Sequence, residues 1–295
     1  DYDISYTKIT PAHYGETKII VRYIDEDNPE NNKSAVANVT VLGHADDYRT
    51  APHMGSGDEF TVALKADGTV WTWGKNTEGQ LGQGGRTSDR NIIPTQVTFS
   101  GLASNAYITK IAVGKAHVVA LDSDGNIWTW GDNTYGQLGD GTYGTSNVDK
   151  FVPRQVRIGQ NESNTKLLTN IKYVAAGANS SAAIDQDGLL YVWGNNDNGQ
   201  LGVDGKIVAY PTLVEALKDN PATPNADETI LVSAVELSES HTIIIDALTK
   251  RAYTWGKNDH NQLGYQQSIL NNGKPMTSPS TENYAKEAHL VTRDK

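Results

Sequence analysis

The chain has 295 residues, of which 37% are hydrophobic, and its 25 Lys and Arg against 35 Asp and Glu give a formal net charge of −10. It contains no cysteine, which excludes disulfides, thiolate metal sites and cysteine nucleophiles. No apolar run approaches the ~20 residues of a membrane span, and no secretory signal peptide is visible. No basic cluster offsets the acidic balance, so the composition opposes duplex DNA binding, which depends on phosphate neutralisation.

Residues 1–46 carry two alternating apolar runs, 17–23 and 35–41, separated by the acidic segment 25–30. Period-two runs joined by such a loop are typical of the closing hairpin of a β-sandwich. The stretch 39–43, Val-Thr-Val-Leu-Gly, resembles the end of bacterial immunoglobulin-like repeats. Since a complete sandwich needs about 100 residues, we interpret 1–46 as the C-terminal part of such a domain or as linker strands.

Four β-hairpins are predicted in the remainder of the chain. In the first three, an apolar run leads through an Asp-Gly turn into a second run, a strong hairpin signal because glycine supplies a positive φ. These hairpins span 60–73, 117–130 and 180–193. The fourth hairpin, 241–255, has a turn one residue longer and without glycine, so we expect it to survive with a looser loop.

Two further strands are predicted beside the hairpins. Apolar runs precede the second, third and fourth hairpins at 108–114, 171–177 and 230–236. Proline-bearing runs follow the first three at 93–97, 152–156 and 210–214. Proline confines these runs to sheet edges or strand starts, and the corresponding run after the fourth hairpin, 287–291, is missing or degenerate. Four short antiparallel strands per repeat predict a propeller blade. A single helical turn is predicted within 211–220.

Every hairpin ends in the same ten-residue string, which reads WGKNTEGQLG in its first copy. The copies occupy 73–82, 130–139, 193–202 and 255–264. A repeat at this spacing marks a fold in which each unit packs against its neighbours. The seventh position of the string is Gly79, Gly136, Gly199 and then Asn261. Asparagine tolerates the left-handed region best after glycine, so this position is predicted to have a positive φ.

The other repeated residues of the string are predicted to be structural. The asparagines at its fourth position should hydrogen-bond the turning backbone, and the glutamines at its eighth position should satisfy buried backbone groups between blades. They are Asn76, Asn133, Asn196 and Asn258, and Gln80, Gln137, Gln200 and Gln262. The leading tryptophans should pack between blades. A repeated ligand site made of these amides is the less favoured alternative.

The hairpin from 117 to 131 together with Gly-Gln-Leu-Gly at 136–139 resembles the regulator of chromosome condensation repeat. The resemblance implies an all-β fold, a β-propeller of four-stranded antiparallel blades over 47–295. Family members usually have seven blades in a closed ring, so four motif copies indicate either a segment of a longer propeller or a ring that closes in an unusual way. An open arc would expose two strand edges, and we favour a partial ring of about four blades, with the remaining repeats in the full-length chain. The family's best-known activity is guanine-nucleotide exchange on the GTPase Ran, together with chromatin binding. We do not carry it over to this chain, because it depends on surface loops of a particular ring and because this acidic chain lacks the basic tail that chromatin contact would favour.

No catalytic, cofactor or metal site is predicted, and there is no G-x-S-x-G elbow for a nucleophilic serine. His117 and His241 occupy matching positions that Phe60 and Ser180 fill in the other repeats, so we expect a role in the blade core. The remaining histidines have no metal-ligand spacing: His13, His44, His53, His260 and His289. The carboxylate pairs at 122 and 124 and at 185 and 187 resemble the start of a calcium loop, but hairpin turns are the better interpretation.

These features predict a non-enzymatic interaction or scaffold module, with a protein or glycan as its unidentified partner, no nucleic acid and no membrane span. The immunoglobulin-like hairpin favours a secreted or cell-surface multidomain protein, extracellular in location. The alternative is an intracellular, cytoplasmic propeller that acts as a scaffold or resembles a guanine-nucleotide exchange factor.

Binding residues cannot be assigned individually, but we expect them in the segments that differ between repeats, because binding loops on a rigid scaffold vary and are polar. These segments are 84–91, 143–151, 159–170, 218–229 and 265–285. The alternative is that they are linkers without a partner.

Overall fold

The structure is a computed structural model that describes residues 15–23, 33–41, 48–144, 148–159, 166–218, 230–264 and 284–290. These ranges contain five antiparallel sheets, two 3-10 turns, η3 (Val148–Phe151) and η4 (Glu215–Lys218), and no α-helix. The fold is all-β, as expected, and η4 lies within the stretch where one helical turn was predicted.

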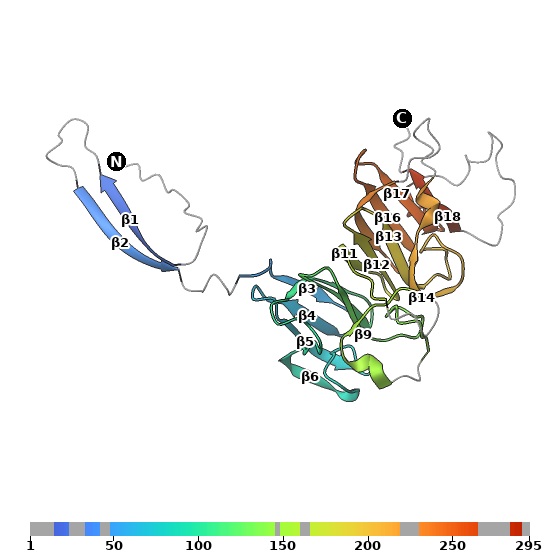
Figure 1. The fold of residues 1–295 in the computed structure, drawn as a ribbon, viewed down its shortest axis with the longest axis horizontal. Coiled ribbons are helices and arrows are strands. Elements are labelled where there is room, and N and C mark those ends of the chain that lie inside the picture. Colours follow the sequence, from blue (N-terminus) through green and yellow to red (C-terminus); the bar gives the residue numbers. More distant parts are fainter. Residues whose placement is uncertain are drawn as a thin grey trace.

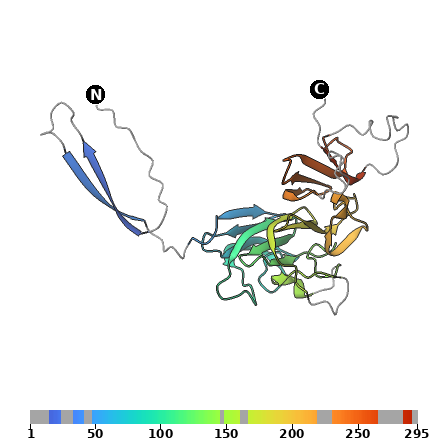
Figure 2. The same ribbon diagram turned by 45° about the horizontal axis from the view of Figure 1, so that its top comes forward.

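Four of the sheets are propeller blades that follow one another along the chain (Figures 1 and 2). Blade 1 contains β3 (His53–Ser56), β4 (Phe60–Leu64), β5 (Val70–Asn76) and β6 (Thr87–Gln96). Blade 2 contains β7 (Ile108–Val113), β8 (His117–Asp122), β9 (Ile127–Gly131) and β10 (Arg154–Gln155). Blade 3 contains β11 (Ile171–Ala176), β12 (Ser180–Asp185), β13 (Leu190–Asn195) and β14 (Ile207–Leu213). Blade 4 contains β15 (Val232–Leu237), β16 (His241–Asp246), β17 (Ala252–Lys257) and β18 (Tyr284–Leu290).

Within each blade the strands pair in sequence order. The first strands of successive blades, β3, β7, β11 and β15, lie against one another. They therefore form the inner side of the arc, and the fourth strands form its outer edge. All four predicted hairpins are present, which confirms the blade as the repeating unit.

The fourth hairpin keeps its register although its turn lacks glycine. Lys250 takes the place of the turn glycine, with a φ of 60°. Its backbone N–H donates to the carbonyl of Asp246 at 3.1 Å, as that of Gly188 donates to Asp185 at 3.1 Å. The extra residue therefore lengthens the turn without changing how it closes.

Two strands differ from the sequence-based expectation. The fourth strand of blade 4, predicted to be missing or degenerate, is present as β18, which pairs with β17. Strand pairing needs backbone groups rather than proline, so the absence of proline does not prevent it. The first strand of blade 1, β3, was not predicted, because its sequence His-Met-Gly-Ser has no apolar run.

The string forms the turn that leaves the third strand of each blade. The Asn side chains accept the backbone N–H five residues later through Oδ1, at 3.1, 3.0, 2.8 and 3.0 Å for Asn76, Asn133, Asn196 and Asn258. Their expected role is therefore confirmed. The prediction that the glutamines satisfy backbone groups between blades holds only for Gln200. Each Oε1 accepts an N–H of its own turn, because a short turn leaves that donor within reach. Among the described contacts, Gln200 Nε2 is the glutamine donor that reaches the next blade, at 3.2 Å from the carbonyl of Glu239.

The string tryptophans of blades 2, 3 and 4 pack against the preceding blade, as predicted, whereas Trp73 of blade 1 is half-buried. Trp130 Nε1 donates to the main-chain carbonyl of Gln80 at 3.0 Å, and Trp193 Nε1 donates to that of Gln137 at 2.8 Å. A Cβ on Gly82, Gly139 or Gly202 would lie 2.8, 2.9 or 2.9 Å from Nε1 of Trp130, Trp193 or Trp255. The final glycine of each of the first three strings thus admits the indole ring of the next blade.

The remaining sheet is the N-terminal hairpin of β1 (Gly15–Tyr23) and β2 (Lys33–Val41), paired without a register shift. The two predicted strands are therefore present. The domain boundary after residue 46 and the immunoglobulin-like origin of this hairpin stay predictions. The acidic segment between the strands lies outside the described residues.

The seventh position of the string has a positive φ in all four copies, at 75°, 78°, 67° and 58° for Gly79, Gly136, Gly199 and Asn261. A Cβ on Gly136 would also lie 2.8 Å from the Cα of Ala209 in the next blade. Gly136→Val should therefore destabilise the chain by about 1–3 kcal/mol, and Gly136→Asn by less, because asparagine adopts this conformation at position 261. Urea unfolding measures both values. Equal losses would show that contact with Ala209, and not backbone conformation, selects glycine.

Candidate functional site

The segments that differ between repeats do not gather on one surface. Because the strands of a blade alternate in direction, the string turn lies at one end of the blade and the connection to the next blade lies at the other. Segments 84–91, 143–151 and 265–285 follow string turns, whereas 159–170 and 218–229 connect blades. The second half of 84–91 belongs to β6. Residues 145–147, 160–165, 219–229 and 265–283 lie outside the described part of the chain.

One cavity of about 560 Å³ lies beside the outer strand of blade 2, and one of these segments, 159–170, contributes Leu167 to its wall. We call it the rim cavity. It is lined by Ser100, Trp128, Asp140, Val152, Pro153, Arg154, Gln155, Arg157 and Leu167. Its volume lies within the range of about 300–1,000 Å³ typical of ligand pockets.

The arginines of the rim cavity are positioned by backbone pairing. Arg154 lies opposite Thr129 in the β9–β10 pair. Beyond β10, Arg157 forms an isolated antiparallel bridge with Leu167, and the N–H of Leu168 donates to the carbonyl of Val156 at 3.0 Å. Val156 and Leu168 are buried, so the alternation of side chains along this ribbon turns Arg157 and Leu167 to the opposite side.

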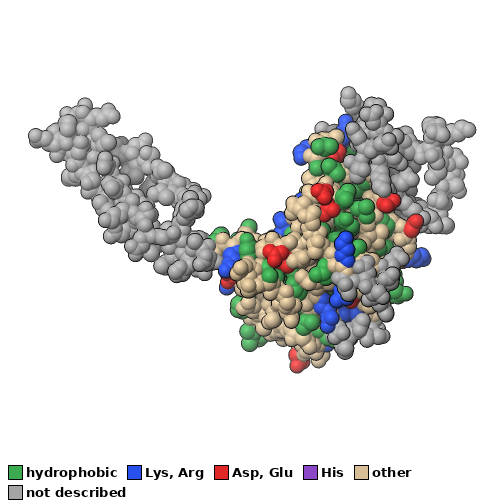
Figure 3. Space-filling view, viewed as in Figure 1, with side chains coloured by type: hydrophobic (Ala, Val, Ile, Leu, Met, Phe, Trp, Pro, Cys, Tyr) green, Lys and Arg blue, Asp and Glu red, His purple; other side chains and the backbone are tan. Residues whose placement is uncertain are grey.

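The charges around the rim cavity are mixed. Asp140 Oδ1 accepts from Thr142 N at 2.9 Å and from Thr142 Oγ1 at 2.7 Å. Lys150 Nζ donates to the carbonyl of Gly144 at 2.9 Å. Burial lowers the pKa of Lys150, and the negative charges of Asp140 and Asp132 oppose that shift. Over the face drawn in Figure 3, acidic and basic side chains are dispersed among polar and hydrophobic ones.

The rim cavity can bind a carboxylate, because guanidinium groups offer paired donors that match carboxylate oxygens. Arg154 and Arg157 are both exposed, while Val152 and Leu167 supply an apolar wall beside them. Sequence analysis did not find this cavity. The proline run at 152–156 was interpreted only as an edge strand. The two closely spaced arginines at 154 and 157 were the one sequence feature that pointed to a binding site there.

His117 lies in the blade core, as predicted from its position in the repeat. It is completely buried, and Phe60 and Ser180 at the equivalent positions are also buried. Its Nε2 lies 3.0 Å from the hydroxyl of Ser181, which donates to the carbonyl of Gln137 at 2.8 Å. The Ser181 oxygen is therefore left as an acceptor, which assigns the imidazole proton to Nε2. Burial lowers the pKa of His117 to about 4.

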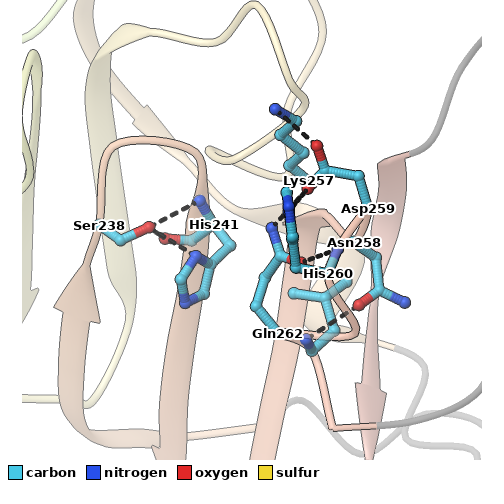
Figure 4. A network of polar contacts seen from close by, with 8 residues as sticks. Ser238, His241, Lys257, Asn258, Asp259, His260 and Gln262 are labelled. Atoms are coloured by element: carbon cyan, nitrogen blue, oxygen red, sulfur yellow. Dashed lines mark hydrogen bonds and ion pairs between the residues drawn. The ribbon is translucent and has the colours of Figure 1, made fainter.

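His241 is half-buried, and Figure 4 shows its Nδ1 beside the hydroxyl of Ser238, at 2.6 Å. A serine–histidine contact is also the geometry of a nucleophile with its base. Here the Ser238 oxygen also accepts the backbone N–H groups of Ser240 at 3.2 Å and His241 at 3.0 Å. The serine therefore closes the turn between β15 and β16, and the contact is structural.

The string turn of blade 4 carries an exposed network, also drawn in Figure 4. The carboxylate of Asp259 contacts Lys257 Nζ at 2.8 Å, His260 Nδ1 at 2.8 Å and Gln262 Nε2 at 3.2 Å. The Lys257 contact, followed by those of His260 and Gln262, holds the pKa of Asp259 below its usual range. The network stays at the surface of its own turn, with the side chain of His260 85% exposed.

The remaining candidates are dispersed. Of the four carboxylates at 122, 124, 185 and 187, Asp122 and Asp185 hydrogen-bond within their own hairpin turns. Asp122 Oδ1 accepts from Asn126 N at 2.9 Å, and Asp185 Oδ1 accepts from Leu189 N at 2.8 Å. His53 is exposed in β3, and the side chain of His289 lies outside the described residues, as do His13 and His44. Within the described ranges, no three His, Asp or Glu side chains are grouped to hold a metal ion.

Comparison with known proteins identifies the repeat. A family model described as "RCC1-like domain" matches residues 21–291. Human RCC2 is 30% identical over 230 residues, covering 72% of this chain and 40% of RCC2. Protein pim1 of Schizosaccharomyces pombe is 29% identical over 221 residues, covering 72% of this chain and 36% of pim1. The chain thus spans less than half the length of either relative.

Solved structures agree on the fold. Prp20p of Saccharomyces cerevisiae superposes with a TM-score of 0.62 at 23% identity, covering 82% of this chain and 51% of Prp20p. Human WBSCR16 superposes with a TM-score of 0.61 at 20% identity, covering 92% and 59% of the two chains. At these identities the similarity establishes the β-propeller fold and nothing further.

The comparisons also correct the predicted location. An extracellular or cell-surface setting is wrong, because RCC2 and pim1, which this chain resembles, are intracellular proteins. That prediction depended on the resemblance of residues 39–43 to immunoglobulin-like repeats, a signal of only five residues. Among the described residues, no helix has the length and apolar character needed to cross a membrane.

Proposed function

This chain belongs to the RCC1-like domain family, and from that premise we propose that it is a non-enzymatic intracellular scaffold that binds a partner protein at the rim cavity. A propeller held together by repeated inter-blade contacts supports such a role, since variable segments on a rigid scaffold are where binding residues concentrate.

The observation that carries the proposal is the pair of exposed arginines, Arg154 and Arg157, beside the apolar side chains of Val152 and Leu167. This combination suits a protein segment in which a carboxylate neighbours an apolar side chain. We therefore favour a protein over a glycan. The structure of Prp20p is described together with its binding to Gsp1p and histones, which supplies two proteins to test.

Of these two, we propose Gsp1p or a protein like it as the partner at the rim cavity. The alternative of an exchange factor predicts in addition that the chain accelerates nucleotide release from a small GTPase. Histone binding is a second candidate, favoured by the formal net charge of −10. A basic partner would be attracted by the whole chain rather than held by arginines, and its binding would weaken strongly with salt.

The experiment is biolayer interferometry of the immobilised chain against Gsp1p and against core histones. Replacing Arg154 and Arg157 with alanine should weaken Gsp1p binding by about tenfold or more, because each charge-assisted hydrogen bond contributes about 1.5–3 kcal/mol. Arg90→Ala, which removes an exposed arginine paired with Glu59 at 2.8 Å on blade 1, is the matched control and should change nothing. Wild-type affinity in the double variant would place the contact elsewhere.

A further inference from the structure

A second cavity lies between blades 1 and 2, beside the Asp-Gly turn of the first hairpin. Its volume is about 280 Å³. One wall is that turn, at 67–69, and the other is formed by residues within 98–107, the connection from β6 to β7. We call it the turn cavity. Because it is slightly smaller than the pockets of about 300–1,000 Å³ that hold drug-sized molecules, it suits an amino-acid side chain better than a cofactor.

The fold leaves the apolar lining of the turn cavity partly uncovered. Phe99, Leu102 and Tyr107 line the cavity and are half-buried. The connections that follow blades 2 and 3 instead bury their leucines, Leu168 and Leu217, each to 2% exposure. Apolar surface that lines a hollow is stabilised when another apolar group covers it. The turn cavity therefore favours an aliphatic side chain as its occupant.

The charged groups of the turn cavity are a guanidinium and a carboxylate. The guanidinium carbon of Arg49 lies 5.6 Å from the centre of the Tyr107 ring. Asp67 Oδ1 accepts from Thr69 N at 2.9 Å and from Thr69 Oγ1 at 2.6 Å, and Asp67 Oδ2 lies 3.4 Å from Lys65 Nζ. The carboxylate is thus engaged by its own turn, whereas Arg49 keeps a positive charge at the cavity. This charge disfavours a lysine or arginine side chain as the occupant.

A single β-turn separates the turn cavity from the rim cavity. The N–H of Leu102 donates to the carbonyl of Phe99 at 3.3 Å, and Gly101 within this turn has a φ of 91°. Phe99 and Leu102 line the turn cavity, while Ser100 lines the rim cavity. Phe99 also contacts Trp128 edge-on, with ring centroids 5.6 Å apart, and Trp128 lines the rim cavity. The two cavities are therefore adjacent, on either side of this turn.

We propose that the two cavities bind one extended segment of a partner protein, with a carboxylate at Arg154 and Arg157 and an aliphatic side chain in the turn cavity. Thr98 lines the turn cavity and Ser100 lines the rim cavity, so the segment crosses about 7 Å, the span of two residues of chain. The aliphatic residue of the segment therefore stands about two to four residues from the acidic one. This inference rests on the proposed binding of a protein segment at the rim cavity, but not on that partner being Gsp1p.

The test uses short acetylated and amidated peptides that contain one aspartate and one leucine, in either order, separated by glycines of varied number. Two tryptophan indole N–H signals in a two-dimensional NMR spectrum report on the cavities separately. Trp128 lines the rim cavity. Trp71 Nε1 donates at 2.9 Å to Thr69 Oγ1, on the wall of the turn cavity. Tryptophan-to-phenylalanine variants assign the two signals.

A peptide with about one to three glycines between its aspartate and leucine should shift both signals with the same dissociation constant. It should bind about tenfold or more tightly than a peptide that lacks either side chain, because the first contact makes the second intramolecular. Leu102→Asn should weaken this peptide about fivefold or more, since part of the apolar lining is lost. Leu248→Asn, at a leucine that is 75% exposed on blade 4, is the matched control and should change nothing.

Two outcomes with the peptides would overturn the proposal. The first is an affinity that depends neither on the leucine nor on the number of glycines. The second is a pair of signals that shift with different dissociation constants, because the cavities would then bind separate segments.

Gsp1p binding distinguishes this proposal from the proposed function. Loss of binding in the Arg154 and Arg157 double variant, with no effect of Leu102→Asn, would overturn the shared groove alone. No binding of Gsp1p, together with the expected peptide shifts, would overturn Gsp1p as the partner and would support the shared groove.

Discussion

Replacing Trp130 with alanine should destabilise the chain by about 3–5 kcal/mol, the cost of removing a fully buried indole from a close-packed interior. The ring is completely buried between blades 1 and 2, and Phe99 contacts it edge-on with ring centroids 5.7 Å apart. Alanine would leave a cavity and would leave the carbonyl of Gln80 without its indole donor, which lies at 3.0 Å. Urea unfolding followed by circular dichroism gives the free energy of unfolding.

Trp73→Ala is the matched control, since Trp73 holds the equivalent place in blade 1 but is only half-buried. Its loss should cost less than about half as much, because less apolar surface is returned to water. If both variants lose the same stability, the indole ring contributes through its own blade. The contact with the preceding blade would then not be the main source of stabilisation.

The chain should be about 2 kcal/mol less stable at pH 5 than at pH 7 on account of His117 alone. Burial lowers the pKa of this side chain in the folded state to about 4, against an ordinary value of 6.5. Below pH 6.5 the unfolded chain therefore takes up a proton that the folded chain does not. The stabilisation is complete above pH 6.5 and is lost as the pH falls towards 4.

His117→Phe tests this assignment, because Phe60 occupies the equivalent buried position in blade 1. The variant leaves the hydroxyl of Ser181 without its imidazole partner, so its stability at pH 7 can fall. Its loss of stability between pH 7 and pH 5 should nevertheless shrink by about 2 kcal/mol. A smaller acid effect remains, since burial also lowers the pKa of His241. An unchanged pH dependence would mean that His117 does not remain neutral in the folded state.

The repeating unit could be predicted from the sequence because its signals are local. Asp-Gly turns between apolar runs define hairpins through the positive φ that glycine allows, and the structure has every one of them. The exchange of Gly136 for Asn261 between copies also indicates a left-handed backbone, since residue type limits φ directly. The cellular location of the protein had no comparable local signal. The extracellular prediction depended on five residues, 39–43, that resemble another type of domain, and it was wrong.

The tertiary structure alone decided how the blades meet. The sequence does not show that Gly79 lies under Phe151, that the main-chain carbonyl of Gln80 accepts from Trp130, or that Arg154 and Arg157 share a cavity. It also does not show that the variable segments divide between two ends of the blades. These contacts depend on how each blade is rotated against the next. That rotation is set by the combined packing of residues far apart in the chain, which no local pattern encodes.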